Sequence, residues 1–182
     1  MVIEQIYKGS VAQGAYYIES KGEIAIKDPP RELQPNIEMA EEKRAKIKYI
    51  FETHFHADFV SGHVTLSEKT GASIIYGPNA NPSFKATIAT DGQEFKLGNL
   101  TIIALHTPGH TMESTTYLLR DAEGKDTAIF SGDTLFLGDV GRPDLAQKAA
   151  TMTQEDLAGI LFDSLRNKIM PLADDITVYP AH

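Results

Sequence analysis

The chain has 182 residues, 42% of them hydrophobic, which is enough for one domain with a substantial core. Its formal charge is −8 and it has no basic cluster that would neutralise phosphates, so nucleic acid is not an expected partner. It also has no apolar run near the ~20 residues of a membrane span, so a membrane is not an expected partner either. It has no cysteine, so any metal ligands must be nitrogen or oxygen atoms, and without a signal-peptide pattern the expected location is the cytoplasm.

The first half of the chain predicts an antiparallel opening followed by alternating strands and helices. Pro35 fits a helix only in its first turn, Asp58 is a candidate N-cap for the helix that follows it, and Gly71 is its predicted left-handed stop. The strand and helix signals predict strands over 2–7, 15–19, 24–27, 47–51 and 73–76, and helices over 32–44 and from 58 to about 69.

The second half predicts further strands and one long helix. Residues 121–126, which include Gly124, have the composition of a hairpin connection, and Thr151 with Gln154 resembles a capping box. The predicted strands cover 100–105, 114–119, 127–130 and 176–179, and the predicted helix covers 154–169. The whole pattern predicts one α/β domain over residues 1–182.

Potential metal ligands follow the predicted strands. Residues 53–63 read T-H-F-H-A-D-F-V-S-G-H, and side chains at alternate positions of an extended segment point the same way. Further ligand types occur in T-P-G-H-T, F-S-G-D-T and Y-P-A-H, each after an apolar stretch. Imidazoles and carboxylates that meet at one point bind transition metals. The candidates are His54, His56, Asp58, His110, Asp133 and His182.

The four motifs in this order resemble the metallo-β-lactamase superfamily. More narrowly, T-H-F-H-A-D-F-V-S-G-H, L-H-T-P-G-H-T-M-E-S-T and S-G-D-T-L-F-L-G-D-V-G-R-P-D resemble its persulfide dioxygenase branch, including forms fused to a rhodanese domain. The resemblance implies an αβ/βα sandwich. In that family more chain follows the late histidine, so a domain truncated after its last ligand-bearing strand is expected here.

The resemblance also implies a reaction and a cofactor. One Fe(II) per chain would be held by His54, His110 and Asp133, with His56 and Asp58 as catalytic residues that orient these ligands without binding the metal themselves. The enzyme would oxidise a low-molecular-weight thiol persulfide with O2 to sulfite and thiol. Zinc is also expected in preparations, because it binds such sites more tightly than Fe(II).

Two alternatives remain open. In a dinuclear zinc thioester hydrolase of the glyoxalase II type, a histidine follows the loop aspartate, whereas this chain has Phe59, which cannot coordinate a metal. A second metal would then depend on Asp58, His182 and a shared Asp133. The other alternative is a metal-binding fragment that is inactive without a missing carboxyl-terminal segment.

Several neighbouring residues have a structural and a functional interpretation. Arg142 is expected either to pair with Asp139 or Asp144, or to bind a substrate carboxylate. Gly109 and Gly132 precede ligands, where tight turns are expected. Because no helix follows the last strand, an uncovered apolar edge and a homo-oligomer are expected, and a fused or separate rhodanese domain is a possible partner.

Overall fold

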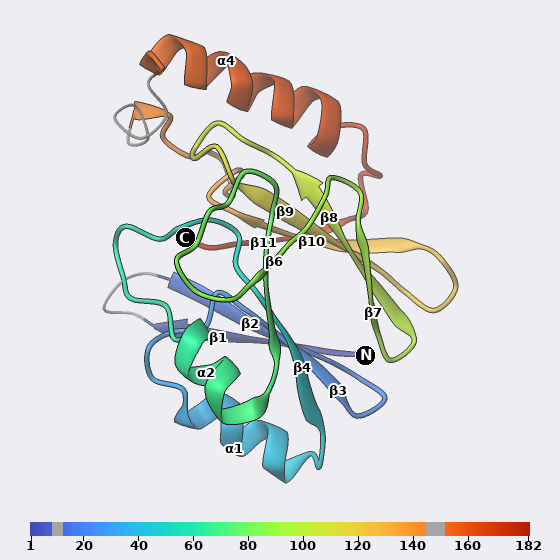
Figure 1. The fold of residues 1–182 in the computed structure, drawn as a ribbon. Coiled ribbons are helices and arrows are strands. Elements are labelled where there is room, and N and C mark those ends of the chain that lie inside the picture. The colour runs from blue at the N-terminus through green and yellow to red at the C-terminus, as the bar shows by residue number, and fades with distance from the viewer. Residues whose placement is uncertain (9–12, 145–151) are drawn as a thin grey trace.

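Two β-sheets pack face to face, with helices on the two outer faces (Figure 1). The computed structural model describes residues 1–8, 13–144 and 152–182. This arrangement is the αβ/βα sandwich that the sequence predicts. Within these ranges, no helix is both long and apolar enough to cross a membrane.

The first sheet has six strands in the order β1-β2-β3-β4-β5-β6. Strands β1 to β3 are antiparallel, and β3 to β6 are parallel to one another. The strands are β1 (Val2–Lys8), β2 (Gln13–Ser20), β3 (Glu23–Lys27), β4 (Lys46–Phe51), β5 (Ser73–Tyr76) and β6 (Thr87–Ile88). The two-residue β6 was not predicted, because it is too short to show a period of its own.

The second sheet has five strands in the order β11-β10-β9-β8-β7. Only the β10–β11 pair is parallel. The strands are β7 (Glu94–Leu97), β8 (Leu100–His106), β9 (Thr115–Arg120), β10 (Asp126–Gly132) and β11 (Thr177–Pro180). The unpredicted β7 has the alternation of a half-buried strand, with Phe95 and Leu97 buried, but over only four residues.

Both helices on the first sheet were predicted, but α1 (Gln34–Glu42) is two residues shorter at each end and α2 (His63–Thr70) begins later than predicted. Helix α1 carries a proline in its first turn, and α2 ends at Gly71 with φ 74°, both as predicted. Helix α2 begins at His63 with Gly62 as its N-cap, so the prediction that Asp58 caps this helix was wrong. The Asp58 carboxylate is instead hydrogen-bonded to His182.

The long helix of the second half is confirmed, although its cap lies two residues later than predicted. Helix α4 (Gln154–Ser164) continues into a π-helix, η2 (Leu165–Ile169). Thr153 and Asp156 form a reciprocal capping box at its start. The predicted cap residue Thr151 lies outside the described residues.

The core lies in three layers, one between the sheets and one on each outer face. Between the sheets, Phe51 contacts Phe95 and Tyr117 at ring-centroid distances of 5.4 and 4.7 Å. Full burial of side chains of this kind contributes roughly 1.5–3 kcal/mol each.

The last strand is covered, contrary to expectation. Ile176 and Val178 pack in the outer cluster that also contains Ile169 of η2. The helix that precedes β11 in the chain therefore provides the cover that a following helix was expected to provide. The expectation of an apolar edge without cover was wrong in part, because Ile176 and Val178 are partly buried, and the homo-oligomer stays a prediction.

The loops that carry the candidate ligands leave the ends of strands in both sheets. His54 follows β4, His110 follows β8, Asp133 follows β10 and His182 follows β11. Since β10 and β11 are parallel, their carboxyl ends lie at the same edge. The sandwich thus brings residues from distant parts of the chain to one end.

Candidate metal centre

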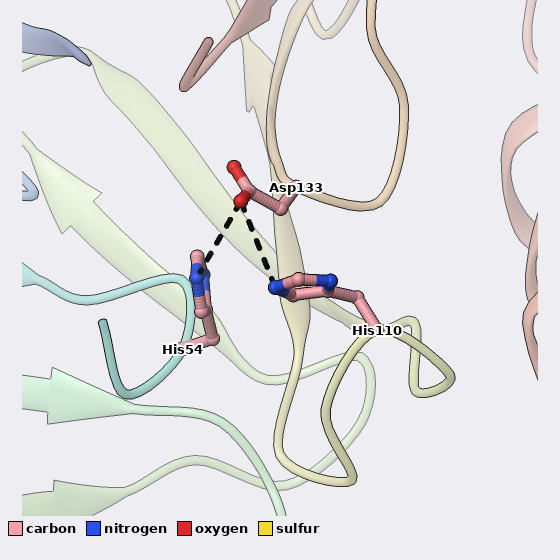
Figure 2. A group of neighbouring side chains, drawn as sticks. All are labelled: His54, His110 and Asp133. Carbon is pink, nitrogen blue, oxygen red and sulfur yellow. Dashed lines mark ion pairs between the residues drawn. The ribbon is translucent and has the colours of Figure 1, made fainter. Parts of the chain in front are cut away.

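Three of the predicted ligands converge at this end of the sandwich. Nε2 of His54 lies 3.9 Å, and Nε2 of His110 lies 3.6 Å, from Oδ2 of Asp133 (Figure 2). One donor atom from each residue lies within 4.8 Å of the others. Donors that are each about 2.1 Å from one ion are roughly 3.0–3.4 Å apart, so these side chains need only a small closure to bind a single metal.

Their protonation states also fit a metal site. Burial lowers the pKa of His54 to about 3, so its imidazole is neutral at pH 7. Burial alone would raise the pKa of Asp133, but a hydrogen bond from His182 and the proximity of His54 hold it below its ordinary value. Metal ligands must be deprotonated, and this cluster supplies a carboxylate with neutral imidazole.

The orientation of His110 is set by the main chain. Its Nδ1 lies 2.9 Å from the carbonyl oxygen of Arg142. A carbonyl only accepts hydrogen bonds, so Nδ1 carries the proton and the lone pair resides on Nε2, the atom that faces Asp133. Such partners behind a ligand fix the ring and increase metal affinity.

Two glycines permit the turns into His110 and Asp133, as predicted. Gly109 has φ 137° and Gly132 has φ 56°, both in the range that favours glycine. A Cβ on Gly109 would lie 2.4 Å from Cβ of Leu161, and one on Gly132 would lie 2.7 Å from the Thr53 side chain. The ligand-bearing backbone therefore packs directly against helix α4 and against the loop after β4.

His56 lies next to the cluster but directs Nε2 away from it. That atom is 3.2 Å from Oδ1 of Asp28 and 3.7 Å from Oε2 of Glu52, and the side chain is 1% exposed. The centroid of its ring lies 4.2 Å from that of His54 and 4.3 Å from that of Phe59. This position agrees with the predicted place of His56 behind the ligands, and Phe59 takes no place in the cluster of three.

Asp28, Glu52 and His56 form a second group whose donor atoms lie within 4.8 Å of one another. Sequence reasoning did not identify Asp28 or Glu52 as site residues; the only signal was their position at the ends of β3 and β4. Nζ of Lys27 lies 2.7 Å from Oδ2 of Asp28, so a buried ammonium already balances this carboxylate. Because a divalent ion would be repelled by Lys27, the first group is the better metal site.

The loop between β4 and α2 is also anchored by a residue that the sequence analysis did not identify. Glu113 is buried, and its Oε1 accepts a hydrogen bond from the backbone N–H of Phe55 at 2.9 Å. The Thr53 carbonyl accepts another from the N–H of Thr115. Glu113 and the first residue of β9 therefore hold the His54 loop in place.

His182 lies between two carboxylates. Its Nδ1 is 2.9 Å from Oδ1 of Asp133, and its Nε2 is 3.0 Å from Oδ2 of Asp58. The hydrogen bond to Asp133, together with that to Asp58, raises the pKa of His182 to about 9. At neutral pH this side chain is therefore a cation at the edge of the cluster, and it joins the two acids that a second metal would need.

Arg142 and His106 serve loop architecture. Nε and Nη2 of Arg142 lie 3.0 and 2.6 Å from the two carboxylate oxygens of Asp144, and Asp139 instead accepts a hydrogen bond from the N–H of Val140. Nε2 of His106 lies 2.9 Å from the carbonyl oxygen of Met112. The pairing of Arg142 with Asp144 was one of the two predicted arrangements.

Comparison with known proteins identifies relatives along nearly the whole chain. Residues 11–182 match the family model described as the metallo-beta-lactamase superfamily. A hydroxyacylglutathione hydrolase of Brucella anthropi is 37% identical over 172 residues, which cover 87% of this chain and 60% of the relative. The chain spans about half to three fifths of the length of the curated relatives it matches.

Two solved structures show the same fold over all of this chain. A metallo-beta-lactamase from Staphylococcus aureus subsp. aureus COL has a TM-score of 0.90 and 34% identity, and 56% of that protein is covered. ETHE1 from Myxococcus xanthus has a TM-score of 0.84 and 29% identity, and 76% of it is covered.

Proposed function

This chain belongs to the metallo-beta-lactamase superfamily, and on that basis we propose that it is a non-haem Fe(II) persulfide dioxygenase. The observation that carries the proposal is the convergence of two histidines and one carboxylate, His54, His110 and Asp133, on one point. The sequence motifs that resemble the persulfide dioxygenase branch contain all three residues.

The composition of this donor set supports iron. Two histidines and one carboxylate leave up to three coordination positions open, and Fe(II) in such a site supplies the chemistry that transfers oxygen from O2 to a bound persulfide sulfur. The side chains of this chain position the donor atoms and set the charge of the site. Buried His54 supplies a neutral donor, Asp133 supplies one negative charge, and cationic His182 favours the approach of an anionic persulfide.

The chain contains no cysteine, so the sulfur that is oxidised must arrive on the substrate. A low-molecular-weight thiol persulfide meets this requirement, and its reaction with O2 and water would give sulfite, two protons and the free thiol. A rhodanese domain, fused or separate, is the proposed partner, and the cytoplasm the proposed location. The partner is proposed from the sequence resemblance, and the location from the Arabidopsis thaliana relative, which is named a cytoplasmic hydroxyacylglutathione hydrolase.

A zinc-dependent thioester hydrolase of the glyoxalase II type is the second candidate. The names of the curated relatives favour it over the first, since they are hydroxyacylglutathione hydrolases at 36–37% identity. Asp58, His182 and Asp133 also lie together, as a second metal would require. Against it, Phe59 provides no donor and His56 directs Nε2 toward Asp28.

One experiment separates the two activities. The metal-free protein is loaded anaerobically with Fe(II) or with Zn(II), and each form is given glutathione persulfide under air or a hydroxyacyl thioester of glutathione under nitrogen. We expect oxygen consumption and sulfite from the Fe(II) form alone. Thioester hydrolysis by the Zn(II) form, without oxygen consumption by the Fe(II) form, would support the hydrolase instead.

The same experiment addresses the third alternative. Metal binding without either activity would identify the chain as a metal-binding fragment. Asp133→Asn is the inactive control, because it removes the anionic ligand. Asp139→Asn is the matched control, because Asp139 is an aspartate of the same loop whose carboxylate accepts a hydrogen bond from the main-chain N–H of Val140.

A further inference from the structure

Thr53 lies directly between a buried carboxylate and the first candidate ligand. Its side chain is buried, with Oγ1 2.8 Å from Oδ2 of Asp28 and 3.0 Å from Nδ1 of His54. The Thr53 N–H also donates to Oδ1 of Asp28 at 2.8 Å. Asp28 therefore accepts hydrogen bonds from both the N–H and the hydroxyl of the residue that precedes the ligand.

The single hydroxyl proton decides the direction of both contacts. An ionised carboxylate only accepts hydrogen bonds, so the Thr53 hydroxyl donates its proton to Asp28. The hydroxyl oxygen is then left to accept from Nδ1 of His54. Nδ1 must carry the imidazole proton, and the lone pair of the neutral ring lies on Nε2, the atom 3.9 Å from Asp133.

The surroundings of Asp28 keep its carboxylate ionised, so that it accepts hydrogen bonds and does not donate them. Burial alone would raise its pKa, but Lys27 and His56 hold that pKa below its ordinary value. Nζ of Lys27 lies 2.7 Å from the same oxygen that accepts the Thr53 hydroxyl. The Asp28 carbonyl in turn accepts a hydrogen bond from Gln13. The charge and position of this carboxylate are thus fixed before any metal binds.

We propose that Thr53 is a positioning residue that fixes the Nδ1–H tautomer of His54 and so directs the Nε2 lone pair toward the metal. It serves His54 as the Arg142 carbonyl serves His110, but a hydroxyl can donate or accept, and Asp28 determines which. This inference rests on the proposed metal centre and is independent of which reaction the metal supports.

The first test reads the tautomer in the unmodified, metal-free protein. Long-range ¹H–¹⁵N correlation spectra distinguish the two neutral forms of histidine by the chemical shifts of the two ring nitrogens. We expect His54 to be protonated at Nδ1 and unprotonated at Nε2 near neutral pH. A His54 ring protonated at Nε2 would overturn the proposal, and this result does not depend on any variant folding.

The second test measures metal affinity without catalysis. Co(II) is titrated into wild type, Thr53→Val, which removes the hydroxyl at nearly constant shape, and Thr53→Ser, which keeps it. We expect Thr53→Val to bind Co(II) about 10- to 100-fold more weakly, as is usual when a partner behind a ligand is lost, and to show an altered visible spectrum. Thr53→Ser is expected to restore the wild-type affinity and spectrum.

Thr101→Val is the matched control for the loss of a buried threonine hydroxyl. Thr101 is buried in β8, and its hydroxyl accepts a hydrogen bond from Lys96. We expect no change in Co(II) affinity. Equal affinity in wild type and Thr53→Val would overturn the role of Thr53. Because neither test uses a substrate, failure of the proposed reaction would leave these outcomes unchanged.

Discussion

Nδ1 of His182 lies 2.9 Å from Oδ1 of Asp133, whereas the other oxygen of the same carboxylate faces His54 and His110. Asp133 thus presents one oxygen to the metal cluster and the other to a cationic imidazole. The imidazole also binds Asp58 and so occupies both acids that a second metal would require.

This relationship predicts one metal per chain. A second divalent ion would have to displace the proton of His182, whose pKa is raised to about 9. Elemental analysis of the Fe(II)- or Zn(II)-loaded protein should therefore give one metal per chain, both in wild type and in His182→Ala. Two metals in wild type and one in His182→Ala would instead place His182 in a dinuclear site.

Asp133→Asn should abolish metal retention, because an amide replaces the anionic donor of the cluster. His56→Ala should weaken binding by about 10- to 100-fold, since His56 orients the site without belonging to the group of three. Metal content after dialysis and isothermal titration measure both effects. Metal loss from His56→Ala as complete as from Asp133→Asn would make His56 a ligand.

Gly132→Ala should destabilise the protein and weaken metal binding. At φ 56° a side chain costs about 1–2 kcal/mol, and the contact of its Cβ with Thr53 at 2.7 Å adds overpacking of typically 1–3 kcal/mol. Gly124→Ala is the control, because Gly124 also has positive φ but has open space around its Cβ position. Urea unfolding should show a smaller loss of stability for Gly124→Ala than for Gly132→Ala. Isothermal titration should show that Gly124→Ala leaves the metal affinity unchanged. Equal losses of stability in the two variants would contradict the packing argument.

Asp28 should make the metal-free protein sensitive to acid. Its folded pKa lies below the ordinary value of 3.8, so its stabilising contribution is present above about pH 4 and is lost as the pH falls toward the folded pKa. Asp28→Asn should cost roughly 3–5 kcal/mol at pH 7, because it leaves Lys27 buried without its partner.

The difference in unfolding free energy between wild type and Asp28→Asn should hold from pH 7 to about pH 5 and shrink below about pH 4. Urea titrations across this range measure it. A difference that grows in acid would contradict the sign of the pKa shift.

Arg142→Ala should leave the Michaelis constant for the persulfide nearly unchanged. Its guanidinium is paired with Asp144 through two hydrogen bonds and is 70% exposed, so it serves the loop more than a ligand. Because exposed pairs contribute little, the melting temperature should change only slightly. A large rise in the Michaelis constant with constant turnover would assign Arg142 to substrate binding.

The sequence by itself determined the features that depend on local chemistry. A few neighbouring residues set each of these features. They are the alternation within T-H-F-H-A-D, the apolar stretches before His110 and Asp133, and the left-handed stop at Gly71. These local patterns predicted the strands and the candidate ligands, and the resemblance that the motifs carry implied the sandwich and the three side chains that converge.

Only the tertiary structure decided how the ligand loop is supported and where its side chains turn. Asp28 follows β3 and contacts Thr53 and His56, which lie 25 or more positions later in the chain. Asp58 contacts His182, 124 positions away, and α2 begins at His63, later than local signals indicate. Burial and charge pairing between distant segments determine these contacts. The hydrophobic periodicity of a short stretch of sequence does not predict them.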